Sequence, residues 1–442
     1  MQVSAWNLSS SSRNRSRRAT VAVRTVPRAK QFQKIREPRR RQTIRSHPTP
    51  SASAAPNSSV VGKSSRLLSV DLLRGITIAF MILVNNNGDE QHAYWPLKHA
   101  AWNGFTPTDL VFPTFLLLVG VSLVFATESR LARGVTRMAI FWSALRRAVT
   151  LYLLGLVVNG FPFFHLATMR YYGVLHRIAI CYLVATVLLL LSSGWRSKVV
   201  VIVGALVGYW ALMRFVPVPG YGIPTHTVPL LDPDGNLAAF IDRHIFSARH
   251  LYEGTRDPEG LLSTLPAIAT ILIGVLTGLW IRTTRPLIAK IRGIALAGIS
   301  LVLCGVLWNP WFPIHKKLWT SSYVLLAGGL SLLLLSLAMA LVDVHRDDKR
   351  DTDRDRHPRL WFPFFVFGTN SIAAYVFSEL LAGGLANIRV PPRSNVMRAL
   401  FQAIHGVVPN LPLASLVFSL LFVVVCWLPI YLLYRKRIFL KV

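Results

Sequence analysis

Charged residues are scarce in this sequence of 442 residues, and acidic ones are scarcer still. Only 15% of the chain is Asp, Glu, Lys or Arg, against about 25% in an ordinary soluble domain, while 52% is apolar. Such a chain lacks the polar surface that would cover a soluble body of its size. The composition therefore excludes a typical cytosolic enzyme and predicts a polytopic membrane protein.

The chain also has few cysteines and none of the short motifs that bind metals or nucleotides. Its three cysteines lie inside apolar runs, at Cys181, Cys304 and Cys426, so they indicate small buried hydrophobic side chains and no disulfide framework. No HExxH, GxSxG or Walker A sequence is found, and no apolar run contains a cluster of carboxylates. No metal site is therefore expected.

Acidic residues are nearly absent from the first 66 residues, which hold 15 Lys and Arg but only one acid, Glu37. This Arg/Ser/Pro-rich segment shows no apolar periodicity, which predicts disorder. It lacks the apolar run of a secretory signal peptide, although its composition is also typical of a transit peptide or of a start codon assigned too far upstream. We interpret residues 1–66 as a disordered basic cytoplasmic tail on anionic lipid, and the net charge of +30 as a sign of topology, with no nucleic-acid partner.

Residues 67–442 contain apolar runs that alternate with polar loops and form one predicted membrane domain. A helix needs about 20 mainly apolar residues to cross the hydrocarbon, and backbone groups in lipid must bond internally. The fold class is therefore predicted as all-α, a polytopic bundle of about ten transmembrane helices. The predicted spans are centred near Phe80, Leu118, Leu154, Leu183, Leu206, Leu272, Leu301, Leu332, Tyr375 and Phe422.

Basic residues predict the orientation of these spans. With the N-terminus in the cytoplasm, the inside segments after the tail hold 21 Lys and Arg, whereas the longer outside segments hold 11. This bias agrees with the positive-inside rule. An even number of spans also returns the basic C-terminus to the cytoplasm. We expect a multi-pass protein, most simply of the bacterial cytoplasmic membrane.

Polar residues within spans are costly in lipid, so each is a candidate for function. In the first span Asp71 and Arg74 are three residues apart and share a helix face, where they form either part of a site or a self-neutralising pair. In the fourth span His176 and Arg177 interrupt an apolar run, which indicates either a cavity lining or a bond between helices.

The loop after the first span holds further candidates. The span ends at Asn85, and the loop carries His99 before Asp109 opens the second span next to a proline that is typical of a helix start. A lone loop histidine is usually a solvated polar residue. Histidine is nevertheless the side chain best suited to proton transfer near neutral pH, with a reference pKa of about 6.5.

This region carries a resemblance to a known family. The segments SVDLLRGITIAFMILVNN and LKHAAWNGFTPTDLVFPTFLLLVGVSL closely resemble the heparan-α-glucosaminide N-acetyltransferase family of transmembrane acyltransferases. Four later segments look like bacterial members of this group: GVLHRIA at 173–179, DPEGLLSTLPA at 257–267, KKLWTSSYVL at 316–325 and FGTNSIAAYV at 367–376.

The resemblance implies an enzyme that takes acetyl groups from cytosolic acetyl-CoA and passes them to an amino sugar across the membrane. It implies a catalytic histidine in the KHAAWNG segment, which is His99, and an active-site asparagine in the VN pair, which is Asn85. The charge bias independently assigns both residues to the outer side. The implied partners are membrane lipid and a glycan or amino-sugar acceptor, with acetyl-CoA as co-substrate.

These roles form a mechanistic hypothesis. His99 serves as general base or as a transient acyl carrier, and Asn85 donates a hydrogen bond to the carbonyl oxygen as it gains charge. Asp109 either orients His99 or caps the second span. Four arginines are candidates for binding the phosphates or pantetheine arm of acetyl-CoA: Arg74, Arg146, Arg147 and Arg177.

Two other functions remain as alternatives on the sequence alone. A transporter or flippase of an envelope glycan precursor would also have many helices with buried polar residues, although the inverted repeats typical of transporters are not evident. An O-acetyltransferase of a cell-envelope polysaccharide would use the same donor and a different acceptor. The sequence leaves open the acceptor, N- against O-acetylation, and the oligomeric state, with a homodimer among the alternatives.

Overall fold

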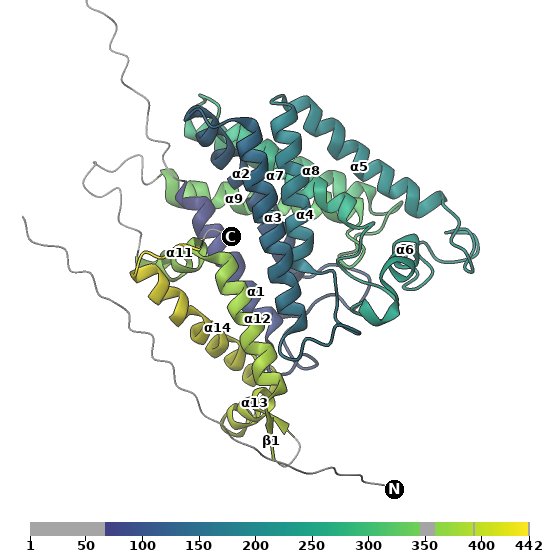
Figure 1. Cartoon of the computed structure of the whole chain (residues 1–442), viewed down its shortest axis with the longest axis vertical. Helices are drawn as coiled ribbons and strands as arrows, with labels where there is room; N and C mark the ends of the chain where they lie inside the picture. The colour runs from purple at the N-terminus through teal and green to yellow at the C-terminus, as the bar shows by residue number, and fades with distance from the viewer. Residues whose placement is uncertain (1–66, 345–358, 392–393, 441–442) are drawn as a thin grey trace, which may run out of the picture. The chain divides into compact units, whose positions relative to one another are not determined.

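The computed structural model describes residues 67–344, 359–391 and 394–440, and the predicted tail at residues 1–66 lies outside them. The described residues form helices joined by loops, with one short hairpin (Figure 1). The α-helices are α1 (Leu68–Asn85), α2 (Val111–Ala132), α3 (Arg137–Gly160), α4 (Val174–Leu191), α5 (Trp195–Phe215), α6 (Leu237–Phe246), α7 (Thr264–Ile281), α8 (Leu287–Trp308), α9 (Ser321–Ala338), α11 (Phe362–Thr369), α12 (Ser371–Asn387), α13 (Val396–Val407) and α14 (Leu411–Arg435). The shorter elements are η1 (Trp95–Leu97), η2 (Pro107–Leu110), η3 (Ala248–His250), the π-helical η4 (Met339–Asp343), η6 (Arg359–Trp361) and the antiparallel strands β1 (Arg389–Val390) and β2 (Ser394–Asn395).

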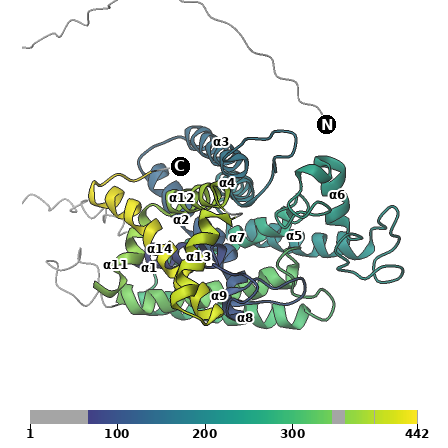
Figure 2. The same cartoon turned by 90° about the horizontal axis from the view of Figure 1, so that it is seen from below.

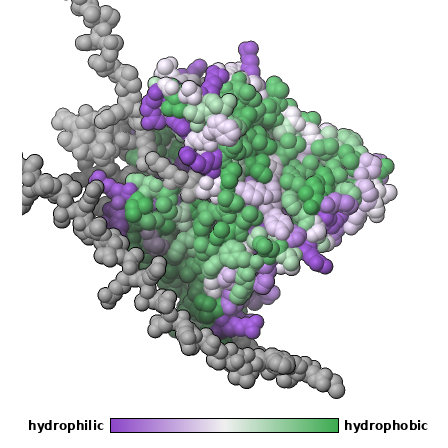
Figure 3. Space-filling model, in the orientation of Figure 1, coloured by the Kyte–Doolittle hydropathy of each residue, from purple (hydrophilic) through white to green (hydrophobic). Residues whose placement is uncertain are grey.

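The all-α prediction is confirmed, and the predicted spans correspond to helices. Within the described residues nine helices are long and apolar enough to cross a membrane. The tenth predicted span, centred near Tyr375, is a pair of helices, α11 and α12, bent by 88° at Asn370. Figure 3 shows hydrophobic residues over most of the visible face, with hydrophilic ones gathered toward its margins. The chain is thus a polytopic membrane bundle.

Close backbone contact between α2 and α7 fixes the middle of the bundle, where Figure 1 shows them near α3 and α4. A Cβ atom on Gly120 would lie 2.1 Å from the Ile271 carbonyl oxygen, and one on Gly274 would lie 2.0 Å from that of Leu117. Neither position therefore tolerates a side chain without separating the two helices, and small residues at such crossings are typical of membrane bundles. The other extensive pairs are α8 with α9, α1 with α11, and α3 with α4.

Contacts between helix termini define two ends of the bundle. Ser69, at the start of α1, bonds Asp343 at the end of η4 through its hydroxyl at 2.5 Å. Arg282, after α7, pairs with Glu128 near the end of α2. We call this the Arg74 end, and the opposite end, where α1 finishes and η2 begins, the His99 end. The segment between α5 and α7 includes α6, which Figures 1 and 2 both show near α5 at one side of the bundle.

Candidate functional site

His99 and Asp109 lie in direct contact at the His99 end. The His99 Nδ1 atom is 2.8 Å from the Asp109 Oδ1 atom, and the side chain of His99 is 35% exposed whereas that of Asp109 is fully buried. The second oxygen of Asp109 accepts hydrogen bonds from the backbone of Ala100 and Thr106. Both predicted arrangements of Asp109 are therefore present at once, since it contacts His99 and also caps the start of the second span.

Lys316 completes this group and was not predicted from the sequence. It lies in the loop between α8 and α9, with its Nζ atom 3.3 Å from the His99 Nδ1 atom and 4.0 Å from the Asp109 Oδ1 atom. Burial holds the pKa of this ammonium below its usual value, although the nearby Glu259 and Asp109 carboxylates raise it. A carboxylate that accepts from Nδ1–H leaves Nε2 as the free nitrogen of the neutral imidazole, which is the arrangement of a general base.

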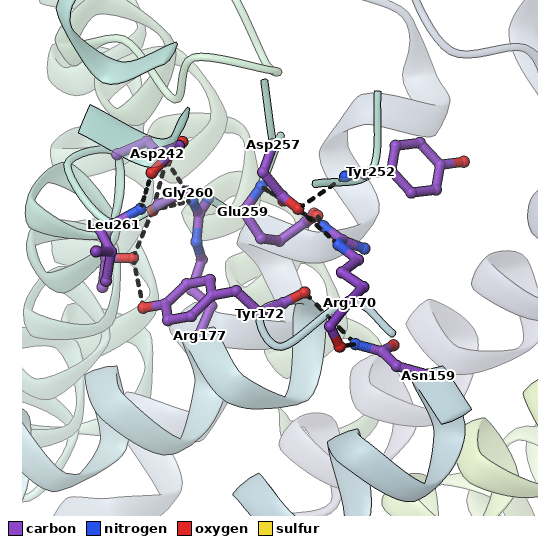
Figure 4. Close-up of polar contacts among 12 residues, drawn as sticks. Asn159, Arg170, Tyr172, Arg177, Asp242, Tyr252, Asp257, Glu259, Gly260 and Leu261 are labelled. Atoms are coloured by element: carbon purple, nitrogen blue, oxygen red, sulfur yellow. Dashed lines mark hydrogen bonds and ion pairs between the residues drawn. The ribbon is translucent and has the colours of Figure 1, made fainter. Parts of the chain in front are cut away.

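A second charged cluster lies next to Lys316 and is shown in Figure 4. The Arg170 guanidinium, in the loop between α3 and α4, binds Asp257 through Nε at 2.7 Å and Glu259 through Nη2 at 2.6 Å. Burial raises the pKa of Glu259, but the positive charges of Arg170, Arg177 and Lys316 outweigh it and hold that pKa below its usual value. This carboxylate is thus kept ionised.

Arg177 lies at the His99 end of α4 and is fully buried. Its Nη2 atom donates to the Gly260 carbonyl at 3.2 Å (Figure 4) and to the Ser263 hydroxyl. Its guanidinium lies over the Trp319 ring at 5.0 Å. The neighbouring His176 ring packs edge-on against Tyr152, with ring centroids 4.4 Å apart. Of the two earlier interpretations, the contacts of Arg177 favour the bond between helices.

Asn85, at the end of α1, is exposed and contacts a residue that was not among the predicted site residues. Its Nδ2 atom donates to the Glu379 Oε1 atom of α12 at 3.4 Å. Asn87, two residues on, donates to the Leu97 carbonyl at 3.2 Å and so holds the loop that carries His99 against the end of α1. Glu379 is an acid inside a predicted span, which is the signal that would have identified it.

A polar cavity of about 510 Å³ opens toward the Arg74 end. Four arginines line it: Arg74, Arg130, Arg146 and Arg147. Arg74 donates to the Asp71 carboxylate at 3.2 Å and to the Ser122 hydroxyl at 2.6 Å, and Arg147 lies 4.8 Å from the centre of the Tyr182 ring. At the α11–α12 bend, Asn370 also lines the cavity and bonds the backbone of Ile438 and Leu440.

The structure thus separates the predicted residues into two groups. It brings Arg74, Arg146 and Arg147 together around the cavity and adds Arg130, while Arg177 is not among the lining residues. It brings His99 and Asp109 together and adds Lys316. Within the ranges that the structure describes, no group of three or more His, Cys, Asp or Glu residues is arranged to hold a metal ion.

These features define a polytopic membrane protein with a histidine–carboxylate pair at one end and an arginine-lined cavity toward the other. The family described as "Heparan-alpha-glucosaminide N-acetyltransferase, catalytic" matches residues 66–284. Two relatives named heparan-alpha-glucosaminide N-acetyltransferase are 31% identical over 374 residues (human) and 30% identical over 377 residues (mouse), covering 71% and 72% of this chain. The chain belongs to the heparan-α-glucosaminide N-acetyltransferase family, which makes it an acyltransferase-family membrane protein. It spans about half the length of these relatives, 53% and 54%.

Proposed function

We propose that this protein is a transmembrane acetyltransferase that moves an acetyl group from cytosolic acetyl-CoA to an amino sugar or glycan on the other side of the membrane. The observation that carries the proposal is the 2.8 Å contact between the His99 Nδ1 atom and the buried Asp109 carboxylate, at the opposite end from the arginine cavity. The names of the relatives support N-acetylation. The resemblance to bacterial members supports a location in a bacterial cytoplasmic membrane.

The arginine cavity is the proposed entry for the donor. CoA carries phosphates, and arginine binds phosphate oxygens through paired N–H groups. Arg146 and Arg147 are exposed on α3 and line the cavity together with Arg74 and Arg130, so four cations face one space. The pantetheine arm then extends toward the His99 end, where the thioester reacts.

His99 is the proposed base. With Nδ1–H bonded to Asp109, the Nε2 atom takes a proton from the attacking acceptor and returns it to the leaving thiolate, and such help contributes about 10²–10⁴-fold. Alternatively, Nε2 attacks the thioester first and carries the acetyl group as an acyl-imidazole. Asn85 is proposed to donate a hydrogen bond to the carbonyl oxygen as it gains charge.

The test is acetyl transfer by the purified full chain, with labelled acetyl-CoA and a panel of amino sugars and lipid-linked glycans. We expect His99→Ala to lose transfer by about 10²–10⁴-fold while binding of CoA is retained. His92→Ala is the matched control, because His92 also contacts an aspartate, Asp89, at 2.8 Å but its side chain is 52% exposed. Transfer by His99→Ala at the wild-type rate would exclude this histidine from the chemistry.

The same assay separates the alternatives. Analysis of the product for an amide or an ester distinguishes an N-acetyltransferase from an O-acetyltransferase. Labelled acetyl-protein formed without acceptor indicates an acyl-histidine, whereas its absence with normal turnover favours direct attack. A transporter would neither transfer acetyl nor gain thermal stability from acetyl-CoA.

A further inference from the structure

Glu379 is a carboxylate in the middle of the apolar sequence of α12, SIAAYVFSELLAGGLAN. A charged side chain within a span is expensive and commonly marks a functional site. The described structure gives it one hydrogen-bond partner, the Asn85 side chain at 3.4 Å. A single neutral amide is a weak compensation for a partly buried carboxylate, which has two oxygens and room for about four donors.

Glu379 also lacks a counter-ion. Across the described ranges no Lys, Arg or His nitrogen lies within 4.0 Å of it, whereas Glu259 has the Arg170 guanidinium at 2.6 Å. The ionisable neighbours that its charge reaches, Tyr375 and Cys426, are ordinarily neutral. An ionised carboxylate in such surroundings is stabilised strongly when a cation reaches it, because the low dielectric magnifies their attraction.

This carboxylate belongs to the His99 end of the molecule. Its partner Asn85 is the last residue of α1, and Asn87 bonds the Leu97 carbonyl two residues before His99. Tyr375, one turn before Glu379 on α12, lies within electrostatic reach of the charges of Glu379, Glu259 and Arg170. Lys316 lies within electrostatic reach of both Glu259 and Asp109. Glu379 therefore borders the same polar region as the His99–Asp109 pair.

We propose that Glu379, together with Asn85, is the residue pair that binds the ammonium group of the amino-sugar acceptor. Glu379 supplies the missing counter-charge and Asn85 Oδ1 accepts an N–H. This inference rests on the proposed function and extends it, because a hydroxyl acceptor has no charge for Glu379 to pair with.

The subsite formed by Glu379 and Asn85 also accounts for both protons that the acceptor nitrogen loses during the reaction. An ammonium acceptor must lose two protons to become an amide. Glu379 takes the first, which leaves a neutral amine whose nitrogen lone pair attacks the thioester carbonyl carbon. As the C–N bond forms and the C–S bond breaks, His99 takes the second proton and delivers it to the thiolate. Free CoA thiol and the amide leave, and Glu379 returns its proton to water.

The experiment uses the full chain with glucosamine as acceptor and glucose as the analogue that lacks the ammonium. We expect Glu379→Gln to raise the KM for glucosamine by about tenfold or more, because a charge pair is lost, and to leave the KM for acetyl-CoA unchanged. Glu379→Asp should restore part of the affinity. Glu90→Gln is the matched control, since Glu90 is an exposed carboxylate in the loop after α1.

Direct measurement of the binding of labelled glucosamine tests the proposed subsite independently of acetyl transfer, which tests the proposed function. If the wild type binds glucosamine but transfers no acetyl, and Glu379→Gln abolishes binding, the subsite stands while the proposed function fails. If the wild type transfers acetyl and the folded Glu379→Gln variant keeps the same KM and binding, the subsite is overturned while the proposed function stands. Displacement of glucosamine by equimolar glucose would likewise overturn it.

Discussion

The two ends of this bundle differ in how their charged side chains are arranged. Within the described structure, the cavity toward the Arg74 end is lined by four arginines and by no carboxylate, although Asp71 contacts Arg74 from behind the lining. At the His99 end, acids and bases alternate in contact, as in His99–Asp109–Lys316 and in Arg170 with Asp257 and Glu259. The positive charges of the cavity favour binding of a polyanion. The paired acids and bases of the His99 end fix protonation states and side-chain orientations.

The comparison predicts that substitutions at the His99 end reduce turnover, whereas those at the cavity weaken donor binding. The largest effect is expected from Asp109→Asn. The amide NH₂ would face Nδ1 of His99 and favour the tautomer that carries its proton on Nε2, so the base is lost. We expect kcat to fall about 100-fold or more, measured as amide formation at saturating substrates.

Asp89→Asn is the control for this prediction. It alters the same kind of histidine–aspartate contact, His92 with Asp89, on the exposed loop. Equal losses in both variants would mean that the contact is structural and that the two ends do not differ as proposed. A melting temperature for each variant separates unfolding from lost chemistry, because Asp109 also accepts from the Thr106 backbone.

A smaller effect is expected at the arginine cavity. Replacement of Arg146 or Arg147 by Ala should raise the KM for acetyl-CoA about tenfold, with kcat and the acceptor KM little changed, because one phosphate contact is removed. Added salt should reduce the difference between variant and wild type. Arg292→Ala, an exposed arginine near the start of α8 that does not line the cavity, should leave this KM unchanged.

The smallest effect concerns stability around α6. Asp242 is 1% exposed, and burial raises its pKa from 3.8 to about 7, while its Oδ1 atom accepts from the Leu261 backbone. The folded protein therefore holds this proton up to about pH 7, whereas the unfolded chain loses it near pH 4. The stability from this group is complete below about pH 4 and is lost as the pH rises through 7.

Asp242→Asn removes this loss because the amide stays neutral and its oxygen still accepts from Leu261. We expect a melting temperature several degrees above that of the wild type at pH 8 and little difference at pH 4, measured by thermal unfolding in detergent. A variant that is destabilised equally at both pH values would show that the Asp242 carboxylate is ionised throughout this range.

The sequence predicted the helices well because span length and apolar composition are local properties. The bend between α11 and α12 was not predictable in this way, since both helices are apolar and the break depends on Asn370 bonding Ile438 and Leu440, which are distant in sequence. A helix break that is held by hydrogen bonds from a side chain to backbone distant in sequence leaves no trace in the periodicity of apolar residues.

The site was predictable only in part. His99 was identified by resemblance, and its contact with Asp109 spans ten residues of loop, so the sequence left the role of Asp109 open. Lys316 lies 217 positions from His99, and only tertiary structure brings them together. Arg177 was grouped with Arg146 and Arg147 because all are basic, although it lies near the start of α4 at the His99 end and they lie within α3 at the cavity.

Helix α1 touches both regions and therefore sets the length of the reaction path. Arg74 and Asn85 are eleven residues apart on this one helix, which corresponds to about 16 Å of axial rise. On the proposed function, a flexible thioester arm need bridge only this interval while its nucleotide stays anchored. Only the two-carbon acetyl group then passes to the other side, while the coenzyme stays where it is bound. The length of α1 between Arg74 and Asn85 therefore has to match the length of the donor's thioester arm.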